Sequence, residues 1–354
     1  MKDGNELEAI DGALRVAKSE TKRPSLILVR THLGFGSPKQ DSFEAHGSPL
    51  GVEDVKLTKR KLGWPVEPLF DVPAEVLAHL REALPRGERL ESEWRELFGR
   101  YAAKHPDLAR EFETVMRGEL PAGWDADIPV FPADPKGMKT RVAAGKVMAA
   151  IAPKLPALMG GSADLDPSTH TQLKGAGDFE SSDSASGDRQ GSSGGGWNYA
   201  GRNLHFGIRE HGMGVILNGM AVHGGIIPYG ATFLIFSDYM RPPMRLAAMM
   251  KQRVIYVFTH DSIALGEDGA THQPVEQLAN LRAVPGLVVI RPCDANEAAE
   301  AWRVAVESRE RPVALILTRQ DVPTLDRSRY APAAALKQGA YSWPRRPTAA
   351  PTSF

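Results

Sequence analysis

Hydrophobic residues recur along the second half of the chain in two alternating patterns. Helical spacing of apolar positions predicts helices over residues 138–152, 209–222, 237–250, 274–282 and 294–307. Short continuous apolar runs between them predict strands near 157–160 and over 226–231, 253–259, 287–291 and 313–318. Strands that alternate with helices form a parallel sheet covered by helices on both faces. We therefore expect an α/β domain whose ligands bind beyond the carboxyl ends of the strands.

The N-terminal residues show a shorter version of this pattern. Apolar residues at helical spacing predict a helix over residues 5–18, and the run SLILVR, residues 25–30, is typical of a buried strand. One strand cannot form a sheet alone, because its backbone groups need partners on both sides. We therefore interpret the N-terminus as the last piece of a larger α/β domain.

Three further segments have other compositions. Residues 64–135 include a charged stretch with large apolar residues at i, i+3, i+4 and i+7, which predicts a packed, mostly helical linker. Residues 175–201 are so rich in Gly, Ser and Asp that we expect a flexible insertion. The Pro-rich residues 323–354 are interpreted as a linker and the truncated start of another domain.

Composition narrows the class of protein. A chain of 354 residues is long enough for two or more domains of about 100–200 residues each. Lys+Arg and Asp+Glu both number 43, so no net charge attracts nucleic acid or an anionic membrane surface. The single cysteine, Cys293, excludes an internal disulfide. No apolar run approaches the roughly 18 residues of a membrane span, and we expect a soluble, cytoplasmic protein.

The stretch GEDGATHQP, residues 266–274, carries polar side chains where a predicted strand ends and a predicted helix begins. Glu267, Asp268 and His272 would thus lie at the carboxyl edge of the sheet. From these residues alone, helix capping by the acids and packing of the histidine explain the stretch as well as ligand binding does.

Glu210 and a group of aromatic residues are further candidates. Glu210 begins a predicted helix, where a carboxylate interacts with the helix dipole, pairs with Arg209, or donates and shares a proton with a ligand. Phe233, Phe236 and Tyr239 are spaced by three and would lie on one side of a helix. Such a row is more typical of a core than of a ligand platform.

The remaining candidates lie near the ends of predicted elements. GGSADLDPS, residues 160–168, ends a strand and by itself indicates a simple turn. Arg141 and Arg319 could each bind phosphate through two hydrogen bonds, although either alone is more typical of a surface ion pair. His260 ends the strand before the GEDGATHQP stretch, and His46 lies in the loop AHGSPLG.

Together these motifs resemble transketolase, the thiamine-diphosphate enzyme. The match runs from LEAI to LILTRQ. Between them, six motifs occur in the family's order and at about its spacing: HGSPLG, GGSADL, GIREHGM, PYGATFL, THDSIALGEDGATHQPVEQ and RPCDANE. Each motif alone is weak, but the ordered set is specific. The resemblance implies the thiamine-diphosphate-binding fold. It also implies transfer of a two-carbon ketol unit from a ketose phosphate to an aldose phosphate through a carbanion of the cofactor.

The resemblance also implies roles for residues at matching positions. Glu210 would hydrogen-bond the aminopyrimidine ring and promote the imino tautomer that removes the thiazolium C2 proton. The other residues that it places around the cofactor are Asp164, Leu165, Phe233, Phe236 and Tyr239. Asp268 and His272 would bind the hydroxyls of the donor ketose and handle protons as its carbon–carbon bond breaks.

Two histidines and a phosphate clamp complete the implied site. His46 and His260 would lie near the reacting carbon and the path of the substrate. The residues implied to bind the sugar phosphate are Arg141, Ser168 and Arg319. A planar guanidinium suits contact with two phosphate oxygens at once.

The chain departs from the family in one respect. Transketolases hold the diphosphate and its divalent cation, Mg²⁺ or another, with a Gly-Asp-Gly motif and a downstream Asn, and no Gly-Asp-Gly occurs here. We therefore predict no metal ligand. The implied domains are a C-terminal remnant of the diphosphate-binding domain, 1–63; the linker, 64–135; the pyrimidine-binding domain, 136–322; and the stub, 323–354.

Alternatives to a complete transketolase remain open. The chain could be a catalytically incomplete fragment or a half-enzyme subunit, because without metal ligands the charges of the diphosphate have no fixed counter-charge. A pyrimidine-domain subunit of a 2-oxoacid dehydrogenase or a deoxyxylulose-phosphate synthase is a third reading, which the implied phosphate clamp disfavours. We expect a homodimer or a complex with a complementary diphosphate-domain chain, since cofactor pockets of this family form between subunits.

Overall fold

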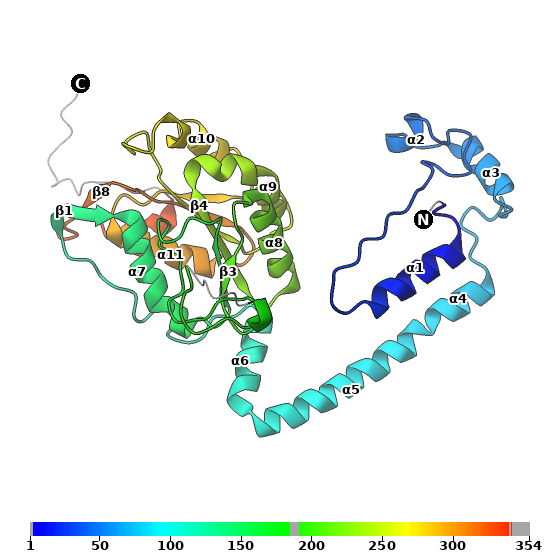
Figure 1. Ribbon diagram of the computed structural model, residues 1–354, viewed down its shortest axis with the longest axis horizontal. Helices are drawn as coiled ribbons and strands as arrows, with labels where there is room; N and C mark the ends of the chain where they lie inside the picture. Colours follow the sequence, from blue (N-terminus) through cyan, green and yellow to red (C-terminus); the bar gives the residue numbers. More distant parts are fainter. Residues whose placement is uncertain (1–2, 185–190, 340, 342–354) are drawn as a thin grey trace. The chain divides into compact units, whose positions relative to one another are not determined.

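The computed structural model describes residues 3–184, 191–339 and 341. They form two compact units, Met1–Leu97 and Phe98–Phe354, and the boundary falls within helix α5 (Ala83–Lys104). Figure 1 labels the elements of both units, which are described separately below. Within the described residues, no helix has both the length and the apolar composition needed to cross a membrane.

The first unit consists of helices joined by irregular segments. Its helices before α5 are α1 (Leu7–Ser19), α2 (Glu44–Gly47), α3 (Val52–Lys61) and α4 (Ala74–Arg81). α1 confirms the helix predicted over residues 5–18. The strand predicted over residues 25–30 is wrong, because this segment pairs with no strand in the described part of the chain and leaves Leu26 84% exposed.

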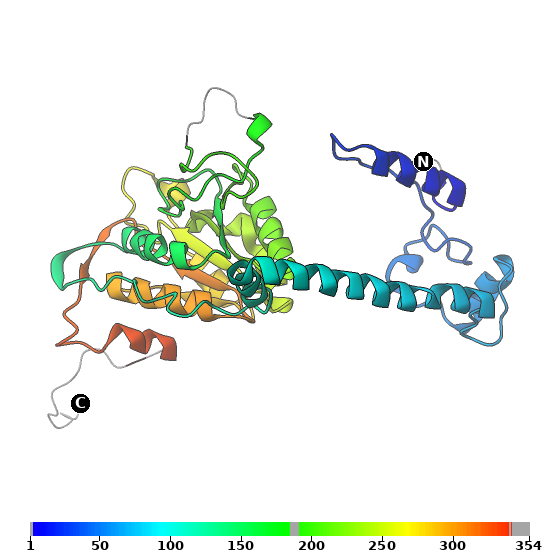
Figure 2. The same cartoon turned by 90° about the horizontal axis from the view of Figure 1, so that it is seen from below.

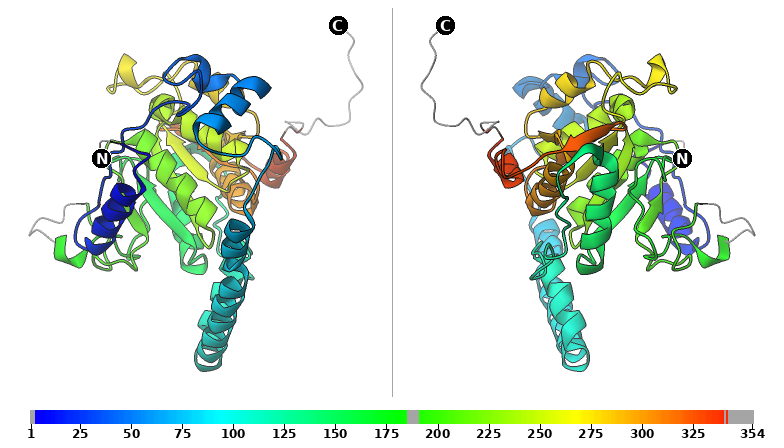
Figure 3. Two further views of the ribbon diagram at one scale, coloured as in Figure 1. Left: turned by 90° about the vertical axis from the view of Figure 1, so that its right-hand side faces the viewer. Right: turned by 90° about the vertical axis from the view of Figure 1, so that its left-hand side faces the viewer.

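The second unit contains a six-stranded parallel sheet in the order β3-β2-β4-β5-β7-β6. Its strands are β2 (Leu158–Ser162), β3 (Asn203–His205), β4 (Ile227–Phe233), β5 (Ile255–Thr259), β6 (Val288–Ile290) and β7 (Val313–Ile316). The helices that cover it are α7 (Thr140–Ile151), α8 (Glu210–His223), α9 (Arg241–Met249), α10 (Gln277–Arg282) and α11 (Ala295–Glu307). Figures 2 and 3 show helices on both faces of the sheet, which confirms the predicted α/β class.

The two faces of the sheet form two separate cores, because successive side chains of a strand point to opposite faces. Ile255 and Val257 of β5 pack in a core that includes Val147 of α7 and Trp302 of α11. The alternate residues Tyr256 and Phe258 pack in a second core with side chains of α8, α9 and α10. A sheet buried on both faces explains why its strands are continuous apolar runs in the sequence.

Two predicted helices differ from the structure at their starts. The helix predicted over 237–250 is a 3₁₀ segment, η3 (Leu234–Met240), followed by α9. The helix predicted over 274–282 begins only at Gln277, so Pro274 lies before its first turn. Pro is common in the first turn of a helix. Pro274 lies about one turn before this helix begins and therefore belongs to the preceding loop.

Three short strands were not predicted from the sequence. β1 (Asp134–Lys139) and β8 (Asp321–Thr324) pair antiparallel in a two-stranded sheet of their own, and β3 forms an edge of the main sheet. Their residues are mostly polar or glycine, so that no apolar run marks them. The β1–β8 pair joins the chain just before α7 to the chain just after β7.

Backbone hydrogen bonds order the described flanks of the predicted insertion, 175–201. Asp178 is fully buried and accepts hydrogen bonds from the Ser193 N–H and the Ser192 hydroxyl, and it contacts Nε2 of His205 at 3.0 Å. The composition gave no sign of this buried carboxylate. The middle of the segment, 185–190, lies outside the described residues, and the predicted flexibility remains untested.

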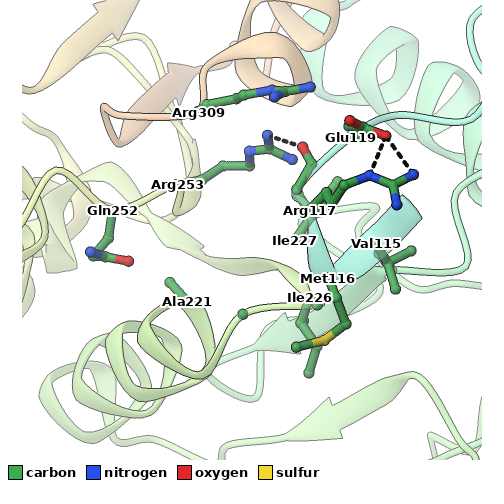
Figure 4. A pocket seen from close by; sticks show the side chains of 14 residues that line it. Val115, Met116, Arg117, Glu119, Ala221, Ile226, Ile227, Gln252, Arg253 and Arg309 are labelled. Carbon is green, nitrogen blue, oxygen red and sulfur yellow. Dashed lines mark hydrogen bonds and ion pairs between the residues drawn. The ribbon is translucent and has the colours of Figure 1, made fainter. Parts of the chain in front are cut away.

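The last linker helix, α6 (Pro106–Met116), ends at the amino edge of the six-stranded sheet. There Arg253 donates to the Gly118 carbonyl at 2.9 Å, which caps a carbonyl just beyond the helix end (Figure 4). Burial, together with the positive charge of Arg309, lowers the pKa of Arg253 to about 10. The cavity between these groups, about 280 Å³, thus lies opposite the carboxyl edge.

Candidate functional site

Four strands deliver candidate residues to the carboxyl edge of the sheet. β4 ends with Phe233, and His260 follows β5 directly. Asp164 follows β2, and Arg319 follows β7. Because the strands are parallel, these residues lie at one edge, as the sequence predicted.

His260 is the most enclosed of these side chains, with an exposed fraction of 3%. Its ring centroid lies 3.6 Å from that of Phe233, and its Nε2 lies 3.4 Å from Nη1 of Arg141. A guanidinium can only donate hydrogen bonds, so Nε2 accepts and Nδ1 carries the proton toward Oγ1 of Thr259 at 2.8 Å. His260 adopts a left-handed backbone conformation, φ +60°, which is uncommon outside glycine and often found at functional sites.

Burial and nearby positive charge keep the His260 imidazole neutral. Burial contributes most to lowering its pKa to about 3, and the charges of Arg141, Arg319 and His272 act in the same direction. A neutral ring has one acceptor nitrogen, which here is Nε2 and faces Arg141. The predicted position of His260 near a reacting carbon is chemically compatible with this state.

Arg141 and Arg319 form a positively charged pair beside His260. Arg141 donates to the Ser168 carbonyl at 2.7 Å, while its Nε is buried without a hydrogen-bond partner in the described part of the chain. Burial lowers the pKa of Arg141, and so does the charge of Arg319, whereas Asp268 opposes both effects. Two guanidiniums with a free buried donor suit an oxyanion such as phosphate.

Arg319 is held by the GEDGATHQP loop. Its Nε lies 3.2 Å from Oδ2 of Asp268, its Nη1 donates to the Leu265 carbonyl at 3.1 Å, and its Nη2 pairs with Glu267. The interpretation of these acids as helix caps is therefore wrong, because they point to the arginine and the following helix begins at Gln277. Ser168 contributes to the clamp through its carbonyl, and its hydroxyl forms no hydrogen bond within the part of the chain that the structure describes.

The aromatic residues form a stacked row rather than one side of an α-helix. Phe236 lies 6.1 Å from Phe233 and 6.2 Å from Tyr239 between ring centroids, with interplanar angles of 17° and 25°. Residues three apart align in η3 because a 3₁₀-helix has three residues per turn. His272 meets the edge of Phe236 at 5.4 Å. Since Tyr239 is 63% exposed, the row is not closed as a core would be.

Glu210 is a buried residue whose carboxylate has no partner in the described part of the chain. It is 8% exposed at the first turn of α8, and no hydrogen bond or ion pair to it occurs within residues 3–184, 191–339 and 341. The predicted pairing with Arg209 is absent, because Arg209 donates to the Phe206 carbonyl instead. α8 packs against both β4 and η3, which carry the aromatic row. A carboxylate with no partner of its own in the described residues is open to a hydrogen-bond donor of a ligand.

Asp164, Leu165 and His46 remain less defined. Asp164 has φ +59° and lines a cavity of about 100 Å³ with Asp178 and His205. The Leu165 N–H donates to the Ser162 hydroxyl, which fixes the turn after β2. His46 lies exposed in α2 of the first unit. No contact in the described residues tests the implied roles of these three residues.

The site suits the ring of the implied cofactor. An aromatic row and a partnerless carboxylate match a planar, hydrogen-bonding ring such as an aminopyrimidine. No group of three or more His, Cys, Asp or Glu side chains that could hold a metal ion occurs in the described ranges.

Sequence reasoning missed two residues at the centre of this arrangement. Thr140 and Thr318 exchange hydrogen bonds immediately beside Arg141 and Arg319. They are 178 positions apart in the sequence, so no local pattern could have linked them. The neighbouring clamp arginines were the only available signal.

Family models match nearly the whole chain. The model of the transketolase pyrimidine binding domain matches residues 136–324, and that of the transketolase thiamine diphosphate binding domain matches residues 1–121. Among curated proteins, the transketolase of Aquifex aeolicus is 48% identical over 341 residues, 96% of this chain and 47% of the relative. The transketolase of Bacillus subtilis is 46% identical over 343 residues, 96% of this chain and 49% of the relative.

Solved structures agree with the sequence relatives. Transketolase from Leishmania mexicana superimposes with a TM-score of 0.86 and 41% identity, covering 96% of this chain and 48% of the other. A Pichia stipitis transketolase in complex with sedoheptulose 7-phosphate gives a TM-score of 0.88 and 38% identity over 98% of this chain and 50% of the other. The chain thus spans about half the length of the relatives it matches.

Proposed function

The chain belongs to the transketolase family, and from this we propose that it serves the transfer of a two-carbon ketol unit from a ketose phosphate to an aldose phosphate. When bound, thiamine diphosphate would supply the carbon nucleophile of this reaction. The observation that carries the proposal is Glu210, whose carboxylate has no hydrogen bond or ion pair in the described residues, on a helix that packs against the elements of the aromatic row.

Each group of side chains has a role in this proposal. The Glu210 carboxylate would bind the aminopyrimidine ring, and Phe233, Phe236 and Tyr239 would exclude water around it. Asp268 and His272 would bind the hydroxyls of the ketose, while neutral His260 would accept a proton or a hydrogen bond near the reacting carbon. The clamp, Arg141 and Arg319 with Ser168, would hold the phosphate end, and the Ser168 carbonyl orients Arg141 by accepting its hydrogen bond.

Further roles of the wider protein are also proposals. We infer a homodimer, since cofactor pockets of this family form between subunits, or a complex with a complementary chain that carries the Gly-Asp-Gly motif and Mg²⁺. Asp164 and Leu165 would then contact the cofactor of a neighbouring subunit, and His46 would lie near the substrate. The single cysteine supports a reducing compartment such as the cytoplasm.

Calorimetry of the full chain with thiamine diphosphate and Mg²⁺ tests the role of Glu210. We expect Glu210→Gln to weaken binding about tenfold or more, because the amide cannot supply the same charge-assisted acceptor. Glu310→Gln, at an exposed position before β7, is the matched control and should leave the affinity unchanged. Equal affinities of the two variants would contradict the assignment of Glu210.

The alternative of a subunit completed by a partner chain has a different outcome. In that case the isolated chain would bind no cofactor, and ketol transfer would appear only after addition of a separate diphosphate-binding domain. Decarboxylation of pyruvate by the same mixture, without ketol transfer, would instead favour a 2-oxoacid-dehydrogenase-like subunit. Micromolar binding by the isolated chain would exclude the half-enzyme reading.

A further inference from the structure

Two buried threonines join the start of α7 to the end of β7. The Thr140 N–H donates to Oγ1 of Thr318 at 2.9 Å, and the Thr318 N–H donates to Oγ1 of Thr140 at 2.7 Å. The two hydroxyl oxygens are 3.2 Å apart. Each threonine therefore satisfies the backbone of the other, in a reciprocal pair that we name the threonine latch.

The threonine latch fixes the backbone position of the residue that follows each threonine. Thr140 is the first residue of α7, and the first N–H groups of a helix have no partner within it. The Thr318 hydroxyl supplies that partner and thereby fixes the first turn of α7 against the chain after β7. Arg141 follows in this turn, and Arg319 follows Thr318 directly.

The positive charges of Arg141 and Arg319 repel each other, so the contacts that hold their backbones together matter for the clamp. Arg141 and Arg319 lie close enough for the charge of one to lower the pKa of the other. Asp268 and Glu267 pair with Arg319, and within the described residues neither forms an ion pair with Arg141. The Ser168 carbonyl and His260 contact the Arg141 guanidinium, and the threonine latch joins the backbones that carry the two arginines.

We propose that Thr140 and Thr318 are positioning residues that hold the Arg141 and Arg319 guanidiniums at the spacing that binds the phosphate of a sugar phosphate. This inference rests on the proposed function, because it assigns a cause to the geometry of the same clamp. Neither threonine touches the phosphate; each acts through the arginine that follows it.

A purely structural role for the threonine latch is less consistent with the fold. β1 and β8 already join the same two segments, with Lys139 opposite Asp321 and Met138 opposite Val322. The hydroxyls are thus not required to bring the segments together. What they add is a fixed orientation of the first turn of α7, on which Arg141 lies.

Substitutions of Thr318 distinguish an effect on the position of the two arginines from an effect on the stability of the fold. Thr318→Val keeps the shape and removes the hydroxyl, whereas Thr318→Ser keeps the hydroxyl. The matched control is Thr324→Val, because the Thr324 hydroxyl is buried and has no hydrogen-bond partner within the described residues. Circular dichroism and thermal unfolding would first establish that the variants are folded.

The first measurement is calorimetry of the full chain with fructose 6-phosphate and, in parallel, with fructose. We expect Thr318→Val to weaken binding of the phosphorylated ketose about tenfold, and Thr318→Ser and Thr324→Val to change it less than about twofold. Affinity for fructose should not change. Equal losses for both ketoses, or an equal loss in Thr324→Val, would overturn the proposal.

The second measurement needs no ligand and separates this proposal from the proposed function. His260 contacts Arg141 directly, so its protonation reports the position of the arginine in the free chain. In NMR titrations, His260 should begin to protonate at higher pH in Thr318→Val than in the parent, Thr318→Ser or Thr324→Val. An unchanged His260 titration in Thr318→Val sinks the proposal whether or not fructose 6-phosphate binds. Failure of the parent chain to bind fructose 6-phosphate, with the titration shifted as expected, counts against the proposed function alone.

Discussion

At the scale of single residues, the site contains ionisable side chains on residues that are buried, although such residues usually lie on the surface. His260 is enclosed between an aromatic ring and a guanidinium, and the carboxylate of Glu210 has no partner in the described residues. Burial disfavours the charged form of His260 and lowers its pKa. Local rules that fail at such positions are typical of binding sites. The residue types were readable from the sequence, but their mutual contacts were not.

The lowered pKa of His260 predicts how stability depends on pH. Its folded pKa is about 3 and its ordinary value 6.5, so as the pH falls below about 6.5 the unfolded chain takes up a proton that the folded chain does not. The contribution of His260 is therefore fully present above pH 6.5 and is lost progressively toward pH 3. Between pH 7 and pH 5 the loss is about 2 kcal/mol.

Urea unfolding of the parent and of His260→Asn at pH 7 and pH 5 checks this expectation. The asparagine does not titrate, so the variant should lose about 2 kcal/mol less than the parent over this interval. Other histidines contribute equally to both proteins and cancel in the comparison. Identical losses in the two proteins would show that His260 is protonated in the folded chain.

At the scale of elements, the alternation of strands and helices was predictable wherever an element is long and apolar. β4, β5, β7 and their covering helices lie within a few residues of the predicted ranges, since burial on both faces leaves a continuous apolar run. The SLILVR segment has the same run but no neighbouring strand in the described residues. Pairing is a long-range property that a local pattern cannot report. For the same reason the sequence gave no sign of the β1–β8 pair or the threonine latch.

The two glycines of β2 explain part of the GGSADL motif in physical terms. A Cβ on Gly161 would lie 1.9 Å from the Leu204 carbonyl oxygen of β3, and one on Gly160 would lie equally close to the Tyr229 carbonyl of β4. Backbone atoms of paired strands cannot move aside as the end of a flexible side chain can. These positions thus allow β2 to pair closely on both sides.

A pair of glycine substitutions tests this account. Gly161→Ala should destabilise the chain by more than about 2 kcal/mol, because the methyl group meets a strand backbone. Gly219→Ala, in the middle of α8 with no atom within 4 Å of its Cβ, should stabilise it by about 0.5–1 kcal/mol. Urea unfolding monitored by circular dichroism measures both changes. Tolerance of Gly161→Ala would mean that β3 does not pair with β2 as described.

At the scale of the whole molecule, the two units differ in how they bury side chains. The second unit has two cores on the two faces of its sheet. In the first unit, only Gly36 and Ser37 are buried among the described residues, while Phe70 is 94% exposed. Many large, exposed apolar side chains on one unit are typical of a surface that another chain covers. This agrees with the proposal of a dimer or a complementary chain, which the sequence motifs also suggested.

Hydrogen exchange of the isolated chain, measured by mass spectrometry, tests whether the first unit is covered in solution. If the chain is alone, amides of α1 and α3 should exchange orders of magnitude faster than those of β4 and β5, because no buried side chains oppose local opening of these helices. Protection of α1 and α3 that equals the protection of the sheet would contradict this expectation. Sedimentation at the same concentration would then distinguish a second copy of the chain from burial within one copy, since only the former doubles the mass and depends on concentration.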